Sequence, residues 1–562
     1  MILNSENEIF NICDLSVFYQ QAYEPSAHPR VVTVLSSLIE RQSSMSSVAT
    51  SPLLKLHPED NIAIARNSVA ENQVCPISES ESVTAREDID LGHKVAIQQI
   101  AKGEPIRKFG QVIGFATFDM QPGDWIHSHN LEAGELSLDY AYSSDVPAPP
   151  KPIEGRTFMG YRRPNGKAGT RNYLAIISTV NCSATASKYI ARELANTSLA
   201  DYPNIDGIIP LVHKGGCAMQ YDGEDHHQLM RTLGGFAKHP NIGAYVVLGL
   251  GCETGQGSFL SDSEGLVQLQ NLNASKPQEP LVLNIQDIGG IAKTVKKVTA
   301  LLQDYLPIVN DVQRVPIPVS ELILGTECGG SDGNSGVTAN PALGIASDLL
   351  VAHGATSILG ETSEIYGGEH LLTRRAITPE VGKKLIDRIK WWEEYTGKFG
   401  VVIDNNPSPG NKRGGLTTIY EKSLGAIAKG GSTALREVYR FAEPVTEKGF
   451  VIMDTPGYDP ASVTGMVAGG ANVVAFTTGR GSCFGCKPVP SIKISTNTPM
   501  YERMEDDMDL DAGRILNGTS VEQVGREIFE LIIEVASGKK TKSEAQGIGD
   551  EEFCPWSIGP VL

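Results

Sequence analysis

Cysteines, histidines and acidic side chains follow most of the short apolar runs in this sequence. The polar residues found just after such runs are Cys182, His213, Cys217, Cys252, Glu253, Cys328, Ser331, Asp332, Glu361, Glu364 and Arg480. In open parallel sheets, ligands bind in the crevice beyond the carboxyl ends of the strands. One cysteine at such a place is commonly a small core residue, but the repetition predicts that these side chains line one functional crevice.

A catalytic divalent metal is the chemistry that this mixture of thiol, imidazole and carboxylate favours, with iron, manganese or zinc as candidates. A closed four-cysteine zinc site is disfavoured because only Cys483 and Cys486 have the Cys-x₂-Cys spacing. A phosphate-binding loop is disfavoured because GGSDGNSG lacks the terminal Lys. A nucleophile elbow at Ser331 would require a deletion in the motif.

Two further polar segments carry candidate residues. His127 and His129 would share one face of a strand and could bind a metal or a carboxylate, although an exposed polar strand end is equally compatible. The loop NPSPGNKRGG at 406–415 combines stiff prolines with glycines and presents Asn411, Lys412 and Arg413. Its cations could hold a substrate carboxylate, or the loop could be a solvated linker.

The apolar runs also predict an α/β fold. From about residue 157, β-branched runs such as YLAIIST and NVVAFTTG alternate with helical stretches such as IGGIAKTVKKVTALLQDY. This alternation indicates mainly parallel sheets covered by helices. WWEEYTGKFG and the following loop interrupt the rhythm near 391–415. We therefore predict two α/β lobes, at 157–400 and 401–562.

The chain before residue 157 has a different character. Residues 51–132 contain short strand-like runs separated by KG and PGD turn signals, which predict a small β-rich module. The proline-dense segment at 133–156 is predicted to be a linker. Residues 1–50 have weak periodicity and a Ser-rich end, and we expect a poorly ordered extension.

Composition excludes several classes of protein. The net charge of −18 over 562 residues, without a Lys/Arg cluster, argues against nucleic acid as a partner. No apolar run reaches the roughly 20 residues of a membrane helix, and the N-terminus has no secretory pattern. The nine scattered cysteines favour a reducing, cytoplasmic location over a disulfide framework.

Taken in order, several motifs resemble the altronate/galactarate dehydratase family of sugar-acid hydro-lyases. These motifs are GHK at 92–94, IHSHN at 126–130, YRRPNGKAGTRN at 161–172, HKGGC at 213–217, GLGCE at 249–253, ECGGSDGNSGVTANPALG at 327–344, NPSPGNKRGG at 406–415, EKSLGAIAKGG at 421–431 and FTTGRG at 476–481. The resemblance covers residues 51–562. It implies an N-terminal SAF-type β-clip domain, a large α/β dehydratase region, and metal-dependent loss of water from an aldonate or aldarate to give a 2-keto-3-deoxy sugar acid.

The resemblance implies a divalent metal, Fe²⁺ first and Mn²⁺ second, and a small sugar-acid substrate; a homo-oligomer is also expected. We assign metal contact to His127, His129, Cys182, His213, Cys217 and Cys252. We assign catalysis to Asp332, Glu253, Glu361, Glu364 and Cys328. We assign substrate binding to Lys412, Arg413, Arg480, Asn411 and Ser331.

Three alternatives stay open at the level of sequence. IHSHN resembles the altronate type, whereas HLLTRRAITPEVGKKL at 370–385 resembles the galactarate type. KPVPSIK at 487–493 resembles the large subunit of sulfolactate sulfo-lyase, which eliminates sulfite. A redox or iron–sulfur protein and a non-catalytic metabolite sensor are the remaining possibilities. The wide spacing of the cysteines in the sequence disfavours an iron–sulfur site.

Overall fold

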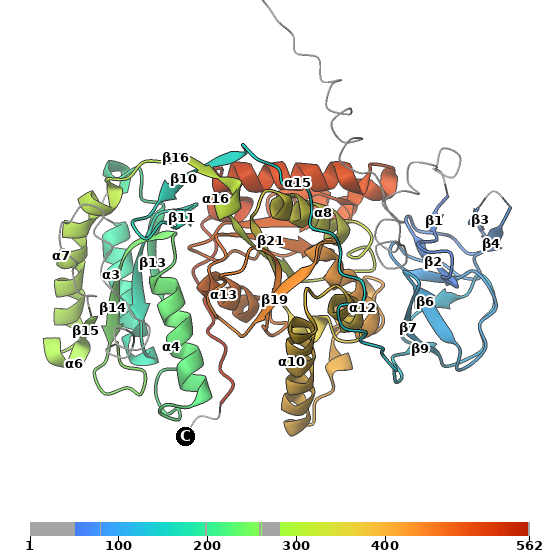
Figure 1. Ribbon diagram of the computed structural model, residues 1–562, viewed down its shortest axis with the longest axis horizontal. Coiled ribbons are helices and arrows are strands. Elements are labelled where there is room, and N and C mark those ends of the chain that lie inside the picture. Colours follow the sequence, from blue (N-terminus) through green and yellow to red (C-terminus); the bar gives the residue numbers. More distant parts are fainter. Residues whose placement is uncertain (1–50, 79, 197–198, 258–259, 261–281, 560–562) are drawn as a thin grey trace, which may run out of the picture.

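The computed structural model describes residues 51–559, apart from 79, 197–198, 258–259 and 261–281. Figure 1 shows three parts in a row, with a small β domain at one end, a four-stranded α/β domain at the other, and a seven-stranded α/β domain between them. The predicted extension at 1–50 lies outside the described residues. Within the described part of the chain, no helix is long and apolar enough to cross a membrane.

The N-terminal β domain consists of short antiparallel strands, as the turn signals predict. Its sheets have the orders β1-β2-β5-β8, β6-β7-β9 and β3-β4. The strands are β1 (Leu53–Leu54), β2 (Ile62–Ala65), β3 (Val74–Pro76), β4 (Ser82–Thr84), β5 (Lys94–Ala96), β6 (Pro105–Lys108), β7 (Gln111–Ala116), β8 (Trp125–Ile126) and β9 (Leu131–Glu132). Ile62, Ile64, Ile106 and Ile113 form its core.

The predicted linker at 133–156 is an ordered strap that runs across the central domain (Figure 1). Its backbone donates hydrogen bonds to two helices, from Ser143 N to Thr373 O at 3.0 Å and from Ile153 N to Ala352 O at 2.9 Å. The strap therefore joins the two end domains while it packs on the middle one.

The four-stranded domain has a parallel sheet in the order β13-β12-β14-β15. Its strands are β12 (Tyr173–Ser178), β13 (Gly207–Leu211), β14 (Ile242–Gly249) and β15 (Val282–Asn284). Its helices are α3 (Asn181–Ala195), α4 (Glu224–Ala237), α6 (Ile285–Ile288) and α7 (Ile291–Asn310). Every residue of β12 and β14 is buried, which explains the uninterrupted apolar runs.

The central domain has a seven-stranded parallel sheet in the order β19-β20-β18-β17-β21-β22-β23. Its strands are β17 (Ile323–Cys328), β18 (Thr356–Leu359), β19 (Leu435–Tyr439), β20 (Gly449–Met453), β21 (Val473–Thr478), β22 (Ser491–Ser495) and β23 (Leu510–Asp511). Two parallel sheets and an N-terminal β domain confirm the predicted fold class.

Helices cover both faces of the central sheet. They are α8 (Ala339–Ala352), α9 (Glu369–Arg374), α10 (Pro379–Lys398), α11 (Pro409–Arg413), α12 (Ile419–Ile427), α13 (Asp459–Gly469), α14 (Thr498–Arg503), α15 (Val521–Ala536) and α16 (Lys542–Gln546). Residues of α8 and α15 share one core with β17, β21 and β22. Residues of α13 share another core with α4 and with strands of both parallel sheets.

The predicted boundary between the two α/β domains near residue 400 is wrong. β17 and β18, which the sequence assigned to the first lobe, pair in the same sheet as β20 and β21. The apparent interruption at WWEEYTGKFG is the end of helix α10, and the Pro/Gly loop lies within the central domain. The chain passes from the four-stranded sheet to the seven-stranded sheet between β15 and β17. In this segment β16 (Val315–Pro318) pairs with β10 (Thr157–Arg162), and β10 also pairs with β11 (Ala168–Gly169).

The strand ends therefore lie at the edges of two different sheets and not in one crevice. Helices α4 and α13 pack together between the sheets, and Gly235 of α4 is so close to Ala468 of α13 that an added Cβ would lie 2.3 Å from its carbonyl oxygen. The prediction of a single crevice treated all the strands as one sheet, which spacing alone cannot decide.

A buried carboxylate between two lysines joins the N-terminal β domain to the central domain. Lys94 Nζ lies 2.8 Å from Glu421 Oε2, Lys108 Nζ lies 2.9 Å from Glu421 Oε1, and all three side chains are almost fully buried. Burial lowers the pKa of Lys94 to about 8. Burial alone would raise the pKa of Glu421, but Lys108 and Lys94 hold it well below its usual value.

We predict that Glu421→Gln destabilises the protein by about 3–5 kcal/mol, because two buried ammonium groups lose their partner. Glu421 contributes stability that is complete above its unfolded pKa of 4.5 and is lost as the pH falls below that value. The variant should therefore lose this acid-sensitive part of the stability, measured by urea unfolding between pH 3 and 7. Glu530→Gln, which removes the exposed partner of Arg156, should cost less than about 1 kcal/mol; equal losses for both variants would contradict the prediction.

Candidate active site

A thiol and four carboxyl groups meet at the carboxyl edge of the central sheet. Cys328 and Glu327 end β17, Glu361 and Glu364 follow β18, and Asp459 begins α13. The Cys328 sulfur lies 3.7 Å from Glu361 Oε1 and 3.7 Å from Glu364 Oε2. Glu361 has a left-handed backbone, with φ of 62°, which directs the chain back over the end of β17. We call these five residues the Cys328 cluster.

Two lysines from one segment neutralise part of this acidity. Lys422 of α12 contacts Glu364 Oε1 at 2.6 Å, and Lys429 just after α12 contacts Glu361 Oε2 at 2.5 Å. Both ammonium groups are buried, and Asn406 Nδ2 adds a hydrogen bond to Glu364 at 2.7 Å. The cluster is thus a charge network with more acidic groups than cations.

Burial and neighbouring charges shift the pKa values of the groups in this network in different directions. Burial alone would raise the pKa of Glu361, but the ammonium of Lys429 lowers it below its usual value. Burial raises the pKa of Glu364, and it raises the pKa of the Cys328 thiol well above its usual value. Burial, with repulsion from Glu361 and Glu364, raises the pKa of Asp459 to about 7. The site thus holds an ionised carboxylate beside a group that can keep a proton at neutral pH.

Glu327 holds its proton more tightly than Glu361 does. It is fully buried, and burial with repulsion from Glu361 raises its pKa well above the usual value. Its Oε2 accepts a hydrogen bond from Ser462 at 2.7 Å, whereas Oε1, taken as a carboxylate oxygen, has no partner among the described residues. A proton on Oε1 satisfies this oxygen, because the carboxyl then donates to Glu361.

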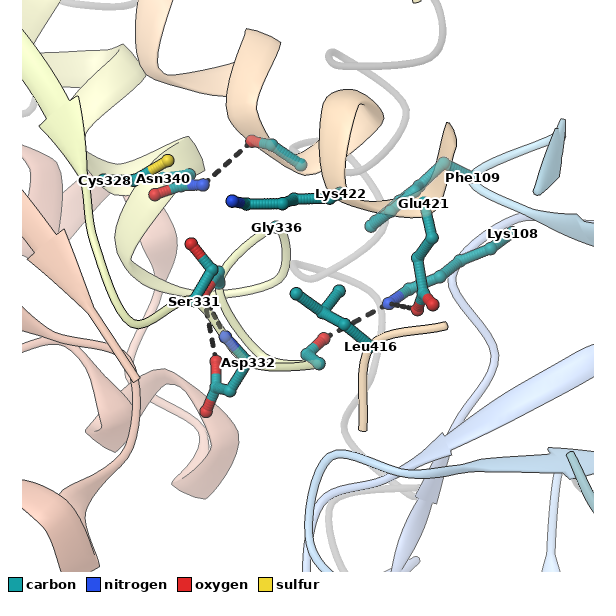
Figure 2. Close-up of a pocket in the computed structure, with 13 residues that line it drawn as sticks. Lys108, Phe109, Cys328, Ser331, Asp332, Gly336, Asn340, Leu416, Glu421 and Lys422 are labelled. Carbon is teal, nitrogen blue, oxygen red and sulfur yellow. Dashed lines mark hydrogen bonds and ion pairs between the residues drawn. The ribbon is translucent and has the colours of Figure 1, made fainter. Parts of the chain in front are cut away.

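A narrow pocket connects this cluster to the N-terminal β domain. Figure 2 shows its wall, in which Lys108 and Phe109 come from the β domain and the other residues from the central domain. Cys328, Ser331 and Lys422 line it. Ser331 is 2% exposed, and its hydroxyl has no partner among the described residues. An unused hydroxyl in a pocket wall is a candidate ligand contact.

Asp332 lines the same pocket, but other groups already occupy its carboxylate. It accepts hydrogen bonds from Thr496 Oγ1 at 2.9 Å, Ser335 Oγ at 3.0 Å, Asn497 Nδ2 at 3.1 Å and Asn334 N at 3.1 Å. Burial raises its pKa despite these donors. This geometry ties the 331–335 turn to the end of β22 and gives Asp332 a positioning role.

The predicted substrate-binding residues lie beside this turn. Asn411 donates to Ser331 O at 2.8 Å. Arg480 is exposed, its backbone N–H donates to Gly330 O at 2.8 Å, and its side chain passes close to Gly414. Lys412 and Arg413 stand on α11, where a capping box on Ser408 begins the helix. The structure thus brings this predicted set together around the 330–332 turn.

The histidines of the β domain contact the backbone of α11. His127 Nε2 lies 2.8 Å from Lys412 O, and His93 Nε2 lies 3.3 Å from Arg413 O. His127 and His129 follow β8 in a turn and do not share a strand face; His129 packs beside Trp125, with ring centroids 5.1 Å apart. Burial lowers the pKa of His127 to about 4, so the ring is neutral and holds the domains together.

The remaining predicted residues lie at the edge of the four-stranded sheet, away from the Cys328 cluster. Cys182, Cys217 and Cys252 are exposed there. His213 Nε2 lies 3.0 Å from Ser178 O and its Nδ1 accepts from Gly215 N at 3.2 Å, so both ring nitrogens are engaged. Glu253 accepts from Thr179 Oγ1 at 2.6 Å and Gly251 N at 2.6 Å. These two side chains shape the loops that carry the thiols.

Two groups of side chains in the described part of the chain could hold a metal ion with three ligand atoms within 4.8 Å of one another. They are Cys328 with Glu361 and Glu364, and Glu327 with Glu361 and Asp459. A thiolate with two carboxylates suits a divalent transition metal.

Sequence reasoning missed Glu327, Asp459, Lys422 and Lys429. The signal was present in EKSLGAIAKGG, where Lys422 and Lys429 stand seven residues apart in an otherwise apolar helical stretch. Residues seven apart share one face of a helix, and charges on an apolar face indicate buried ion pairs.

Family comparisons cover almost all of the described chain. A SAF domain family of altronate/galactarate dehydratases matches residues 51–134, the second domain of D-galactarate dehydratase/altronate hydrolase matches 160–310, and the C-terminal domain of D-galactarate/altronate dehydratase matches 319–561. These bounds agree with the three parts of the fold.

Three relatives are similar over most of their length. Altronate dehydratase of Bacillus subtilis is 35% identical over 87% of this chain and 96% of its own. Galactarate dehydratase (L-threo-forming) of Escherichia coli is 37% identical over 89% of this chain and 95% of its own. The beta subunit of (2R)-sulfolactate sulfo-lyase from Chromohalobacter salexigens is 32% identical over 71% of this chain and 97% of its own.

We predict that Glu327→Gln and Glu361→Gln have opposite consequences. Glu327 has a raised folded pKa, so its stabilising effect is present below 4.5 and is lost as the pH rises. At pH 8 a neutral Gln, whose amide can still donate to Glu361, should be as stable as Glu or more so. Glu361→Gln leaves Lys429 buried without a charged partner and should cost about 3 kcal/mol or more. Urea unfolding at pH 8 measures both, and a larger loss for Glu327→Gln would contradict the assignment.

Proposed function

Because the chain belongs to the D-galactarate/altronate dehydratase family, we propose that it removes water from an aldonate or aldarate such as altronate or galactarate. Hydro-lyase activity on a sugar acid is the reaction class of this family. The product is a 2-keto-3-deoxy sugar acid. The observation that carries the proposal is the Cys328 cluster, in which ionised and protonated carboxyl groups lie together beside a pocket.

The reaction sets three demands on the site. The C2–H bond next to a carboxylate must lose its proton to a base, the hydroxyl on C3 must leave with a proton from an acid, and the charge that develops on the substrate carboxylate must be stabilised. The enol that forms then tautomerises to the 2-keto acid. Electrons move from the C2–H bond into the new double bond and out with the C3–O bond, so no redox partner is needed.

Cys328, Glu361 and Glu364 are the residues that would hold a divalent metal, with Fe²⁺ and Mn²⁺ as the candidates. One sulfur and two carboxylate donors within 4.8 Å of one another support this assignment. Such a metal supplies Lewis-acid stabilisation of the substrate carboxylate and a neighbouring hydroxyl. The positive charges of Lys422 and Lys429 keep Glu364 and Glu361 in place and lower the cost of burying their charge.

Proton transfer is best assigned to the carboxyl groups around this centre. Asp459 is partly buried and has a pKa of about 7, which suits a group that gives a proton to the leaving hydroxide at neutral pH. Glu361 and Glu364 are the other candidates for proton transfer. Either of them would act as the base only if it does not bind the metal. Glu253 lies at the other sheet and Asp332 is saturated with hydrogen bonds, so we no longer propose either as the base.

Substrate contacts are proposed for Ser331 and Lys422, which line the pocket, and for Arg480, which lies beside the turn that Asn411 fixes. Lys412 and Arg413 stand at the outer end of the same α11 segment and would meet the distal end of a polyol acid. The nearly equal identities to altronate and galactarate dehydratases, 35% and 37%, leave both acids as candidates.

Elimination of sulfite is a weaker alternative. The KPVPSIK stretch that suggested it leads into β22 and includes its first three residues; Lys487 contacts Asp550, and Lys493 donates to Phe484 O at 2.9 Å. These contacts give the stretch a structural role away from the Cys328 cluster. A cytoplasmic role in sugar-acid catabolism is part of the proposal and fits the free thiols.

We predict that the purified protein with Fe²⁺ or Mn²⁺ converts altronate or galactarate to a keto-deoxy acid and leaves sulfolactate unchanged. Cys328→Ser should lower kcat/KM by more than the ~10–100-fold expected for loss of an outer-shell metal partner, and should weaken metal binding in calorimetry. Cys486→Ser, also at a buried cysteine, is the control for general loss of packing. Sulfite release without dehydration would overturn the substrate assignment, and full activity of Cys328→Ser would overturn the metal assignment.

We also predict that Ser331→Ala separates activity from stability. The Ser331 hydroxyl is buried without a partner among the described residues, so its removal should leave the free energy of unfolding unchanged or raise it by about 1 kcal/mol. Loss of a substrate hydrogen bond should raise KM or lower kcat about tenfold. Ser462→Ala, whose hydroxyl donates to Glu327, should instead lose stability. A Ser331→Ala variant with wild-type kinetics would exclude the contact.

A further inference from the structure

Three exposed cysteines at the carboxyl edge of the four-stranded sheet have no role in the proposed dehydration site. Cys182 follows β12, Cys217 follows β13 and Cys252 follows β14. They stand at equal intervals along the chain, from 182 to 217 and from 217 to 252, and each follows one strand of consecutive βα units, Cys182 in the first turn of α3 and the other two in loops. The wide spacing in the sequence, which disfavoured an iron–sulfur site, therefore does not place them at different edges of the fold. Parallel strands bring such loops to the same edge.

The three loops touch one another directly. Asn181 N donates to Gly215 O at 3.1 Å, and Gly255 N donates to Gly216 O at 3.1 Å. Gly216 is so close to the first loop that an added Cβ would lie 2.1 Å from Thr179 O. Each cysteine is one to three residues from one of these contacts. The loops therefore hold the three thiols around one small area of surface.

The imidazole and the carboxylate of these loops are already used. His213 engages both ring nitrogens with backbone groups, and Glu253 is buried and accepts hydrogen bonds from Thr179 and Gly251. The thiols are exposed, with Cys252 accepting from Gln286 Nε2 at 3.2 Å. The sulfur atoms are thus accessible donors at this edge, whereas His213 and Glu253 are occupied inside the loops.

The first helix of this edge favours negative charge at Cys182. Helix α3 is 15 residues long, has no acidic residue in its first turn, and its N-cap residue Val180 makes no side-chain cap. Its first N–H groups therefore face the thiol area with the positive end of the helix dipole. Such a helix end favours a bound group that carries negative charge.

The three sulfur atoms, as placed, do not lie close enough together to share one zinc ion. Thiolates at about 2.3 Å from a single zinc ion must lie within roughly 4.6 Å of one another. In the described part of the chain, the groups with three ligand atoms within 4.8 Å do not include these cysteines. The iron–sulfur clusters that proteins hold through thiolates spread their ligands over several iron atoms.

We propose that Cys182, Cys217 and Cys252 hold a [4Fe–4S] cluster that leaves one iron without a protein ligand. A preassembled cluster in its 2+ state exchanges three small terminal ligands for the three thiolates, and the three thiol protons go to solvent, without a change in oxidation state. The fourth iron is then open to a small oxygen ligand such as a carboxylate. This site lies at a different sheet edge from the Cys328 cluster and does not depend on the proposed dehydration site.

The test is anaerobic transfer of a preassembled [4Fe–4S] cluster with small thiolate ligands to the full chain. The wild type should gain a broad visible absorption and about four iron and four sulfide per chain. Cys182→Ser, Cys217→Ser and Cys252→Ser should each lose most of this absorption, and they should fold normally because the side chains are exposed. Citrate should perturb the absorption of the loaded wild type through the open iron.

Two controls separate this site from other thiols and from the proposed function. Cys483→Ser, at an exposed cysteine of the central domain, and Cys328→Ser should both keep the absorption. Loss of the absorption in Cys483→Ser to the same extent, failure of the wild type to take up the cluster, or binding of iron without sulfide would each overturn the proposal. Dehydration that persists in the three serine variants while the absorption is lost would leave the Cys328 site intact and confirm two separate sites.

Discussion

The Glu421 carboxylate is the interaction on which the arrangement of domains depends. It lies between Lys94 and Lys108 of the N-terminal β domain, and Thr417 adds hydrogen bonds from N at 3.0 Å and from Oγ1 at 2.7 Å. A buried carboxylate is tolerated only when its charge and lone pairs are matched. The β domain supplies the two lysines that balance this charge. The buried carboxylate of Glu421 is therefore stabilised only when the two domains are docked.

Helix α12 transmits this constraint to the candidate site. Glu421 faces the β domain, and the next residue, Lys422, faces Glu364 in the Cys328 cluster. Lys429 follows the same helix and reaches Glu361. The same docking closes the pocket, since Lys108 and Phe109 form part of its wall (Figure 2). Docking of the β domain and placement of the acidic groups are therefore one structural event.

Much of the fold could be predicted from the sequence, because burial on both faces leaves a clear pattern. β12 and β21 coincide with the predicted apolar runs YLAIIST and NVVAFTTG. The sheet to which a strand belongs leaves no such pattern, since β17 has the same composition whether it pairs with β14 or with β21. The boundary near residue 400 and the single crevice both followed from that missing information.

The glycine motifs show the same limit for the site. The glycines of ECGGSDGNSG are suited to a close approach of the backbone to a ligand or to another segment, and the close approach at Gly333 is to the chain itself. An added Cβ on Gly333 would lie 2.0 Å from Gly92 O, and one on Gly415 would lie 2.4 Å from the same atom. The motifs around 92, 333 and 415 are therefore three sides of one domain contact. The glycine content of a motif shows that its backbone can approach another group closely. Only the packing shows whether that group is a ligand or another segment of the chain.

The two parallel sheets use the same geometry to make two kinds of site. At both edges, loops after neighbouring strands bring distant residues together. At the central sheet the edge is covered by α12 and the β domain, so its acids are buried and paired with lysines. At the four-stranded sheet the thiols are exposed, and the buried carboxylate of Glu253 accepts hydrogen bonds from Thr179 and from the Gly251 backbone. The degree of burial therefore sets the properties of the side chains at each edge, because burial shifts the pKa of the acids and exposure leaves the sulfur atoms accessible.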